Sequence, residues 1–180
     1  MLQIEIEKGI KMEQDLIKKY ESVLPEELLD IWENYGQAEL LDGYLRIINP
    51  EEYQELLEET YFRGKVSVPI MTTAFGDIIT IEEGEYIGIV KYKNGTFGML
   101  AKSFKRFMQF ITDDYFLGKY FQIPQYEEAV KRIGKLKHDE CFGYVPLLGL
   151  GGSEKFENLS KVKIREHIEL ISQLVGRIAM

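Results

Sequence analysis

The sequence predicts an α+β fold, in which an antiparallel β-meander of three to five strands is flanked by N-terminal and C-terminal helices. Two observations predict it. Between residues 66 and 101 the apolar residues follow a strand-like period, and turn signals recur at short intervals. On both sides of this segment apolar residues recur at helical spacing, with prolines and capping residues at the expected starts. Strands in one block and helices in others are typical of the α+β class.

Three helices are expected before the meander. The apolar spacing of residues 12–22 predicts the first helix. Pro25 suits the first turn of the second helix, and Gly36 is a plausible stop for it. Asn49 is an N-cap for a third helix over residues 50–61, because an asparagine followed by proline and two acids suits a helix start.

The meander is expected to contain strands at 66–72, 78–82, 86–92 and 97–100, with a further strand at 44–48 before the third helix. Asn94 and Gly95 suit the two positive-φ positions of a type I′ turn, so a tight hairpin is predicted there.

Helices are expected again after the meander. Ser103 can cap one helix, a short aromatic segment ends at Tyr120, and Pro124 opens another helix to about Lys137. Residues 138–153 are glycine-rich and are expected to form loops. A last helix is predicted over residues 162–176, with an apolar spine of Ile164, Ile168, Ile171 and Val175.

The chain has 180 residues, of which 45% are hydrophobic, enough to bury a core without disulfides or metals. We expect two parts packed together as one compact unit. Residues 1–110 would form an α+β part with the third helix and the meander, and residues 111–180 a helical C-terminal part.

The charge is divided unevenly along the chain. The net charge is −8, but residues 1–90 carry 20 acids and 7 bases, a balance of −13, whereas residues 91–180 carry 10 acids and 15 bases, a balance of +5. An acidic surface repels phosphate backbones and attracts basic partners. The acidic half is therefore either an ordinary solvated surface or a docking surface.

Composition argues against several classes of protein. Cys141 is the single cysteine, so no intrachain disulfide exists. No apolar run approaches the ~20 residues that span a bilayer, and the first residues do not form a secretory signal. A cytoplasmic protein that does not bind membranes is therefore expected. One cysteine and two histidines cannot supply a zinc site by themselves, so neither a metal nor a cofactor is predicted.

Catalytic patterns are weak. His138 and Cys141 are close in sequence, but adjacent residues point in divergent directions, and an inert buried cysteine is the preferred interpretation. The glycines of residues 149–153 lack the Lys-Ser/Thr of a P-loop and are better explained as turns. We therefore predict no catalytic residue, and an enzyme is the least favoured hypothesis.

The acidic third helix is the main candidate for function. Its polar side would form a docking surface for a basic partner, joined by acids of the meander. The predicted contact residues are Glu51, Glu52, Glu55, Glu58, Glu59, Asp77, Glu82 and Glu83.

Several segments together resemble a known family. LPEELLDIWENYG at residues 24–36, LDGY at 41–44, INPEEY at 48–53 and TAFGDII at 73–79 resemble the GAD-like domain. CFGYVPLLGLGG at 141–152, with VKIREH at 162–167, resembles the C-terminal domain of type VI secretion immunity proteins. The resemblance runs from about residue 15 to 176, with SUKH-type immunity proteins as a more distant relation.

This resemblance implies an immunity protein, which binds a cognate toxin and blocks it without doing chemistry. In the best-known relatives the toxin is a DNase delivered by type VI secretion, so a basic nuclease is the expected partner. The alternative hypothesis is an accessory nucleic-acid- or ligand-binding module without catalytic activity, because the basic half of the chain could contact nucleic acid.

Overall fold

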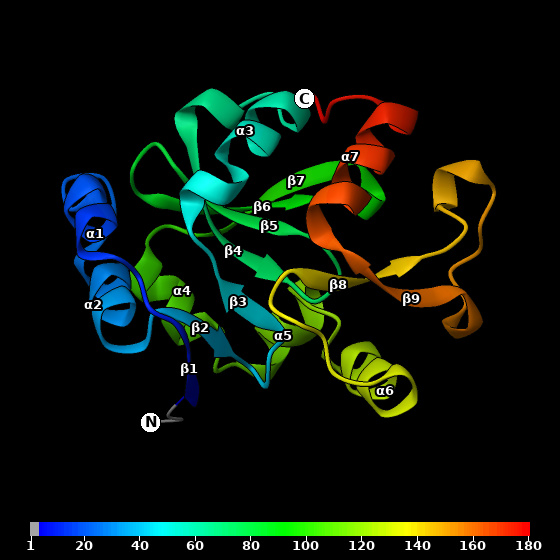
Figure 1. Cartoon of the computed structure of the whole chain (residues 1–180), viewed down its shortest axis with the longest axis horizontal. Helices are drawn as coiled ribbons and strands as arrows, with labels where there is room; N and C mark the ends of the chain where they lie inside the picture. Colours follow the sequence, from blue (N-terminus) through cyan, green and yellow to red (C-terminus); the bar gives the residue numbers. More distant parts are fainter. Residues whose placement is uncertain (1–3) are drawn as a thin grey trace.

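The computed structural model describes residues 4–180 (Figure 1). The helices are α1 (Gln14–Tyr20), α2 (Glu26–Tyr35), α3 (Pro50–Thr60), α4 (Phe104–Phe110), α5 (Asp114–Tyr120), α6 (Ile123–Ile133) and α7 (Ile164–Val175). The strands are β1 (Ile6–Ile10), β2 (Gln37–Leu40), β3 (Leu45–Ile47), β4 (Ser67–Thr73), β5 (Ile78–Glu82), β6 (Tyr86–Lys91), β7 (Thr96–Ala101), β8 (Glu140–Tyr144) and β9 (Leu159–Lys163). Short 3₁₀ turns are η1 (Gly64–Val66), η2 (Tyr92–Asn94), η3 (Leu148–Leu150) and η4 (Phe156–Asn158).

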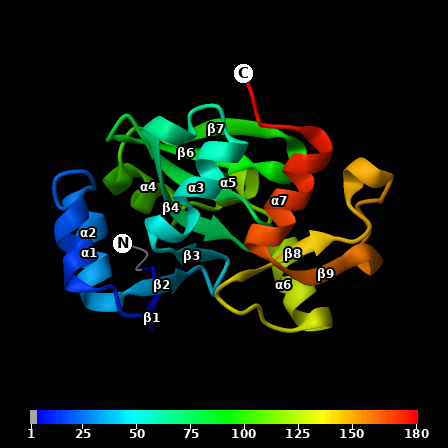
Figure 2. The same cartoon turned by 45° about the horizontal axis from the view of Figure 1, so that its top comes forward.

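The strands β1 to β7 form one large sheet in sequence order, and each pair of neighbours is antiparallel. Helices α3 and α7 lie side by side over one face, as the views in Figures 1 and 2 agree. Helices α2 and α4 pack on the opposite side, against the two ends of the sheet. Because helices cover both faces, the sheet is the centre of the molecule and α3 and α7 together form one outer surface.

Strand β5 shows how the sheet serves two cores. Ile79 and Ile81 belong to the larger core cluster, on the α2 and α4 side. Ile78 belongs to the smaller cluster, which α3 and α7 cover. Since side chains alternate along a strand, Thr80 and Glu82 share the side of Ile78. The strand therefore directs an acidic side chain beneath α3.

The α+β class is confirmed, but the expected three to five strands are too few. Within residues 4–180 the large sheet has seven strands, because β1, β2 and β3 extend the meander at one edge. Strand β1 is mostly exposed and rich in charge, so its sequence gives little strand signal. Gly9 allows its close pairing with β2, since an added Cβ would lie 1.8 Å from the Gln37 carbonyl oxygen.

The type I′ turn predicted at Asn94 and Gly95 is wrong. Tyr92, Lys93 and Asn94 form the 3₁₀ turn η2, and Gly95 alone takes a left-handed conformation, with φ +65°. One positive-φ residue after a helical turn reverses the chain equally well, which explains why the hairpin itself forms as expected between β6 and β7.

The segment expected to be loop, residues 138–153, contains strand β8, which forms a second sheet with β9. Strands β8 and β9 pair as an antiparallel hairpin, with Glu140 opposite Lys163, so helix α7 begins only at Ile164. Val175 was expected in the core but is exposed at the end of α7. Helix α6 ends before Lys137, because Gly134 follows it with φ +101°.

Local start signals are confirmed where they rest on capping. The Ser103 hydroxyl accepts from the Arg106 N–H at 3.2 Å at the start of α4. In the described residues no helix is both long and apolar enough to cross a membrane.

Candidate functional site

Helix α3 carries the acidic surface that the sequence predicts. The Asn49 side chain caps it by accepting from the Glu51 N–H at 3.0 Å, and Pro50 occupies its first turn. Tyr53, Leu56 and Leu57 are buried beneath it. The glutamates therefore point outward: Glu51, Glu52, Glu55 and Glu59 are exposed, and Glu58 is half-buried.

Neighbouring elements hold α3 in place mainly through its backbone and its polar underside. The Gln54 amide donates to the Gly64 and Ser67 carbonyls at 2.9 and 3.2 Å, which ties α3 to η1 and β4. Arg177 donates to the carbonyls of Glu58 and Tyr61 at 3.0 and 2.8 Å, where the helix ends and its carbonyls lack partners. The surface is thus built on a fixed scaffold.

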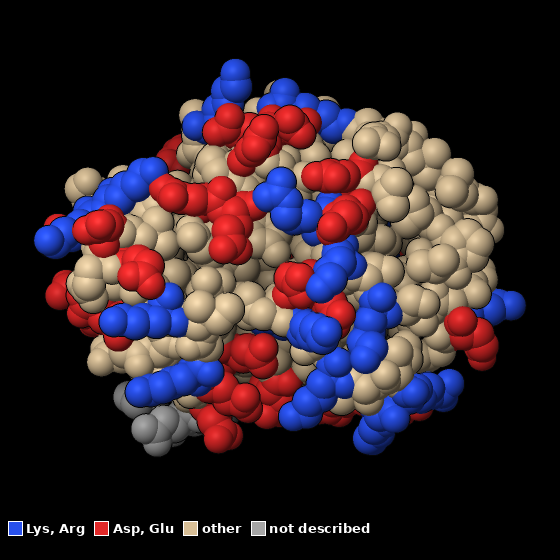
Figure 3. Space-filling view, viewed as in Figure 1, with Lys and Arg blue, Asp and Glu red and all other residues tan. Residues whose placement is uncertain are grey.

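Most of the α3 carboxylates have no cationic partner. Glu51 pairs with Lys19, but within residues 4–180 Glu52, Glu55 and Glu59 form no salt bridge. Arg165 lies next to α3 and donates to the Glu52 backbone carbonyl rather than to its carboxylate. Acidic side chains accordingly gather over α3 in Figure 3. The helix presents to solvent three carboxylates that form no salt bridge with a described residue, Glu52, Glu55 and Glu59.

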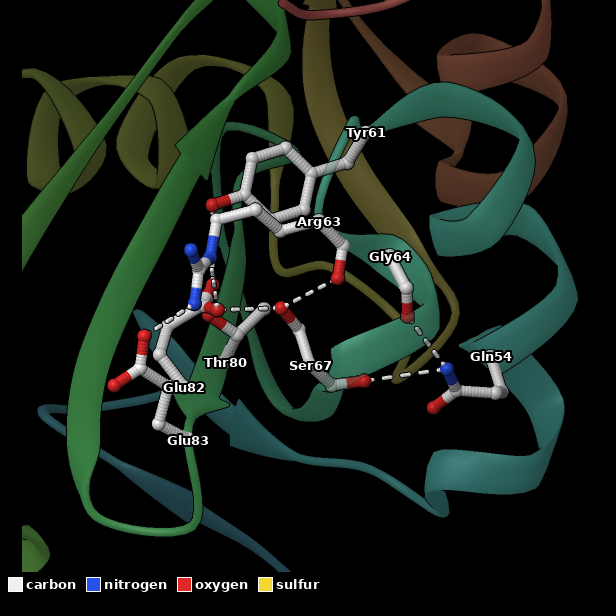
Figure 4. Close-up of polar contacts among 8 residues, drawn as sticks. All are labelled: Gln54, Tyr61, Arg63, Gly64, Ser67, Thr80, Glu82 and Glu83. Carbon is white, nitrogen blue, oxygen red and sulfur yellow. Dashed lines mark hydrogen bonds and ion pairs between the residues drawn. The ribbon is translucent and has the colours of Figure 1, made fainter. Parts of the chain in front are cut away.

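Glu82 lies below this surface and is enclosed by donors (Figure 4). One carboxylate oxygen accepts from the Tyr61 and Thr80 hydroxyls at 3.1 and 2.9 Å. The other accepts from Arg63 Nε at 3.1 Å and from the Ser67 hydroxyl at 2.5 Å. The residue is 3% exposed, so its carboxylate is a structural anion that cross-links β5, η1 and the end of α3.

Asp77 is the second buried acid, at the opposite end of β5. It accepts from the Thr73 hydroxyl at 3.0 Å. Burial raises its pKa from 3.8 to about 6, although the ammonium groups of Lys91 and Lys93 oppose the shift. Its carboxylate is therefore poorly accommodated compared with one that receives several donors.

The structure corrects two of the eight expected contact residues. Asp77 and Glu82 are buried and cannot reach a partner's surface. Glu83 is exposed at the turn after β5 and pairs with Arg63 at 2.9 Å. The five glutamates of α3 lie on one helix, so they remain together as a candidate docking surface.

The weak catalytic candidates have no activated group. Cys141 is fully buried, and burial raises the pKa of its thiol to about 12, so it is not a thiolate near neutral pH. Burial and the nearby Arg46 lower the pKa of His138. In the described part of the chain no three His, Cys, Asp or Glu side chains lie together as a metal site.

A second surface feature was missed by the sequence analysis. A cavity of about 220 Å³ opens between η2, the loop after β8 and helix α7. Leu174 lines it, yet the spine assigned to α7 omitted this residue and its neighbour one turn earlier, Leu170. Two leucines off the buried stripe of an amphipathic helix were the signal that could have found it.

The comparisons with known proteins divide the chain in two. Residues 3–93 match the family model of the GAD-like domain. Residues 101–175 match the model described as T6SS immunity protein Tdi1, C-terminal. No curated protein matches the chain.

The fold is similar to that of a solved structure, the crystal structure of Atu4351 from Agrobacterium tumefaciens. The TM-score is 0.72 at 20% sequence identity, and the similarity covers 92% of this chain and 82% of that one. At this identity the likeness shows the fold.

Proposed function

Because the chain belongs to the GAD-like domain family and continues into the C-terminal domain of a type VI secretion immunity protein, we propose that it neutralises a cognate bacterial toxin by occluding the toxin's active site. The expected toxin is a basic nuclease, and the expected compartment is the cytoplasm. The single observation that carries the mode of binding is the row of exposed carboxylates on α3, of which Glu52, Glu55 and Glu59 form no salt bridge with any described residue.

A nuclease active site has to attract a polyanion, and a surface of fixed carboxylates offers a similar charge. The scaffold under α3 keeps these groups in place before the partner arrives, which limits the entropy lost on binding. The Cys141 thiol, at a pKa of about 12, is not a ready nucleophile. Both features support inhibition by binding rather than by chemistry.

We further propose that residues 1–110 and 111–180 act as one compact unit. Arg46 of β3 is buried and its guanidinium donates to the backbone carbonyls of Lys137, His138 and Glu140. The Phe142 N–H donates to the Ala74 carbonyl at 2.7 Å. These bonds support a rigid link between the two parts, so a toxin could contact both without an ordering cost between them.

The test is a double charge reversal on α3, Glu55→Lys with Glu59→Lys. The matched control is Glu33→Lys, an exposed glutamate on α2 on the opposite side of the sheet. We expect the double variant to associate about 10-fold more slowly with an inactivated domain of the cognate toxin, at low salt. It should also protect toxin-expressing cells less well, while its melting midpoint stays near that of wild type.

If the double variant binds and protects as wild type does, α3 is not the docking surface. If wild type neither binds nor protects against that toxin, the immunity function itself is wrong for that pair.

A second candidate is an accessory nucleic-acid-binding module. One observation favours it: exposed lysines gather on α6, the segment between α6 and β8, and strand β9, the blue area at the lower right of Figure 3. They are Lys131, Lys135, Lys137, Lys161 and Lys163. Binding of single-stranded RNA that weakens steeply with salt would support this alternative.

A further inference from the structure

The cavity beside α7 is lined mainly by aliphatic side chains. They come from the loop after β8 and from the C-terminal half of the helix: Leu147, Leu148, Ile171, Leu174 and Val175. The loop packs directly on the helix, since a Cβ added at Gly149 would lie 2.6 Å from Leu174 Cδ2. At about 220 Å³ the cavity is smaller than the roughly 300–1,000 Å³ of small-molecule sites. It is the size of a pocket for one large side chain.

Exposed apolar side chains also lie on the two segments that line most of the cavity, α7 and the loop after β8. The exposed fractions are 65% for Leu150, 53% for Leu170, 41% for Leu174 and 57% for Val175. We call these four residues, with Leu147, Leu148 and Ile171, the apolar face. In Figure 3 the surface at the right, over the C-terminal half of α7 and the loop after β8, carries few charged side chains. Contiguous exposed apolar surface of this kind marks interaction sites.

The polar groups at the cavity supply no free charge to an occupant. Lys93 pairs with Glu154 at 3.5 Å, and its ammonium lies 5.6 Å from the centre of the Tyr144 ring. Burial lowers the pKa of His167, which favours a neutral imidazole. An occupant that gains by entering is therefore an aliphatic or aromatic side chain.

The apolar face adjoins the acidic surface. Helices α3 and α7 pack against each other, and Glu166 and Glu169 are exposed on α7 itself. An apolar centre bordered by charge is the usual arrangement of a protein interface. A symmetric pair of copies joined through this face would bring like-charged α3 helices together, so the charge disfavours a second copy as the occupant.

We propose that the apolar face is the anchoring site for the toxin, which inserts an apolar side chain into the cavity while basic groups around that side chain meet the acids of α3 and α7. This inference rests on the proposed function and adds to it the place where the binding energy is concentrated. Buried apolar anchors dominate interface energies, whereas charges at the border contribute mainly to the rate of encounter.

The experiment compares Leu174→Asp with Tyr115→Asp. Tyr115 is 77% exposed on α5, so it gives the same change of chemistry at another exposed apolar residue. The ligand is an inactivated domain of the cognate toxin, and affinity is measured by titration. We expect Leu174→Asp to weaken binding by about 30-fold or more. Tyr115→Asp should stay within about 3-fold of wild type, and melting midpoints should show that both variants fold.

The outcomes separate the two proposals. If wild type binds the toxin and Leu174→Asp binds as tightly, the anchoring site is wrong and the immunity function stands. If wild type binds no toxin, both fail. If wild type forms dimers that Leu174→Asp dissolves, a second copy occupies the face and the anchoring proposal is overturned.

Discussion

The acidic surface of α3 and the apolar face of α7 lie next to each other but are built in opposite ways. Helix α3 is capped, held through its backbone carbonyls and supported by the donors around Glu82. The apolar face has aliphatic side chains around a cavity and no free charge at its centre. Charge acts over about a Debye length, whereas apolar contact acts only on touching. The difference indicates that the acidic surface attracts a partner from a distance and that the apolar face holds the partner once it has bound.

The two buried acids at the ends of β5 repeat this contrast. Glu82, under the acidic surface, receives four donors, whereas among the described residues the side-chain donor to Asp77 is the Thr73 hydroxyl. Asp77 lies near Lys93 and Asn94, which also line the apolar cavity. The Glu82 carboxylate thus stabilises the fold through its donors, whereas the buried Asp77 carboxylate destabilises it.

The largest expected effect comes from removing the anion beneath the acidic surface. Glu82→Gln places an amide against Arg63 and leaves buried donors without an acceptor. We expect a loss of about 3 to 5 kcal/mol in the free energy of unfolding, measured by denaturant titration.

The control is Glu83→Gln, which touches the same arginine from an exposed position, and it should cost less than about 1 kcal/mol. Equal losses in the two variants would mean that the Glu82 network does not support the fold.

A smaller effect of opposite sign is expected at the other end of β5. The pKa of Asp77 is raised to about 6 in the folded state, above its ordinary value of 3.8. The folded protein therefore holds an extra proton between these values, and stability falls as pH rises through about 4 to 6. Asp77→Asn should remove this fall and stabilise the protein at pH 7 by about 3 kcal/mol.

Melting midpoints of both proteins measured from about pH 4 to pH 8 would check this. The curves should approach each other at the acid end and separate above about pH 6. Parallel curves would show that Asp77 does not carry an unfavourable charge.

The sequence predicted features that depend on neighbours along the chain. The caps at Asn49 and Ser103 and the outward glutamates of α3 follow from local chemistry and helical period. The burial of Glu82 does not follow from local sequence. Alternation along β5 predicts which residues share a face of the sheet, but tertiary packing decides what covers each face. The nearly unbroken apolar run at 78–81 was a signal that both sides are covered. With both sides covered, an acid at the end of the strand has to be buried.

The hairpin β8–β9 and the cavity were missed for a related reason. The two strands are joined by a long loop rather than by a short hairpin turn, so the turn chemistry that signals a hairpin in a sequence is missing between them. The cavity depends on where that loop returns to α7, so its lining residues come from three segments separated in sequence. Such a site is a property of the packed molecule.

The smallest expected effect is that of a change in charge at the acidic surface. It tests whether this charge affects association with a partner without affecting the stability of the fold. Lys19→Met removes the cation that pairs with the Glu51 carboxylate of α3. The pair is exposed, so the melting midpoint should not change measurably. Because the surface becomes more negative, association with a basic toxin should quicken by less than about two-fold at low salt, and the gain should vanish at about 500 mM salt. Lys105→Met, on α4 away from α3, should leave the rate unchanged, and a clear loss of stability in Lys19→Met would mean that the acids hold the fold rather than attract a partner.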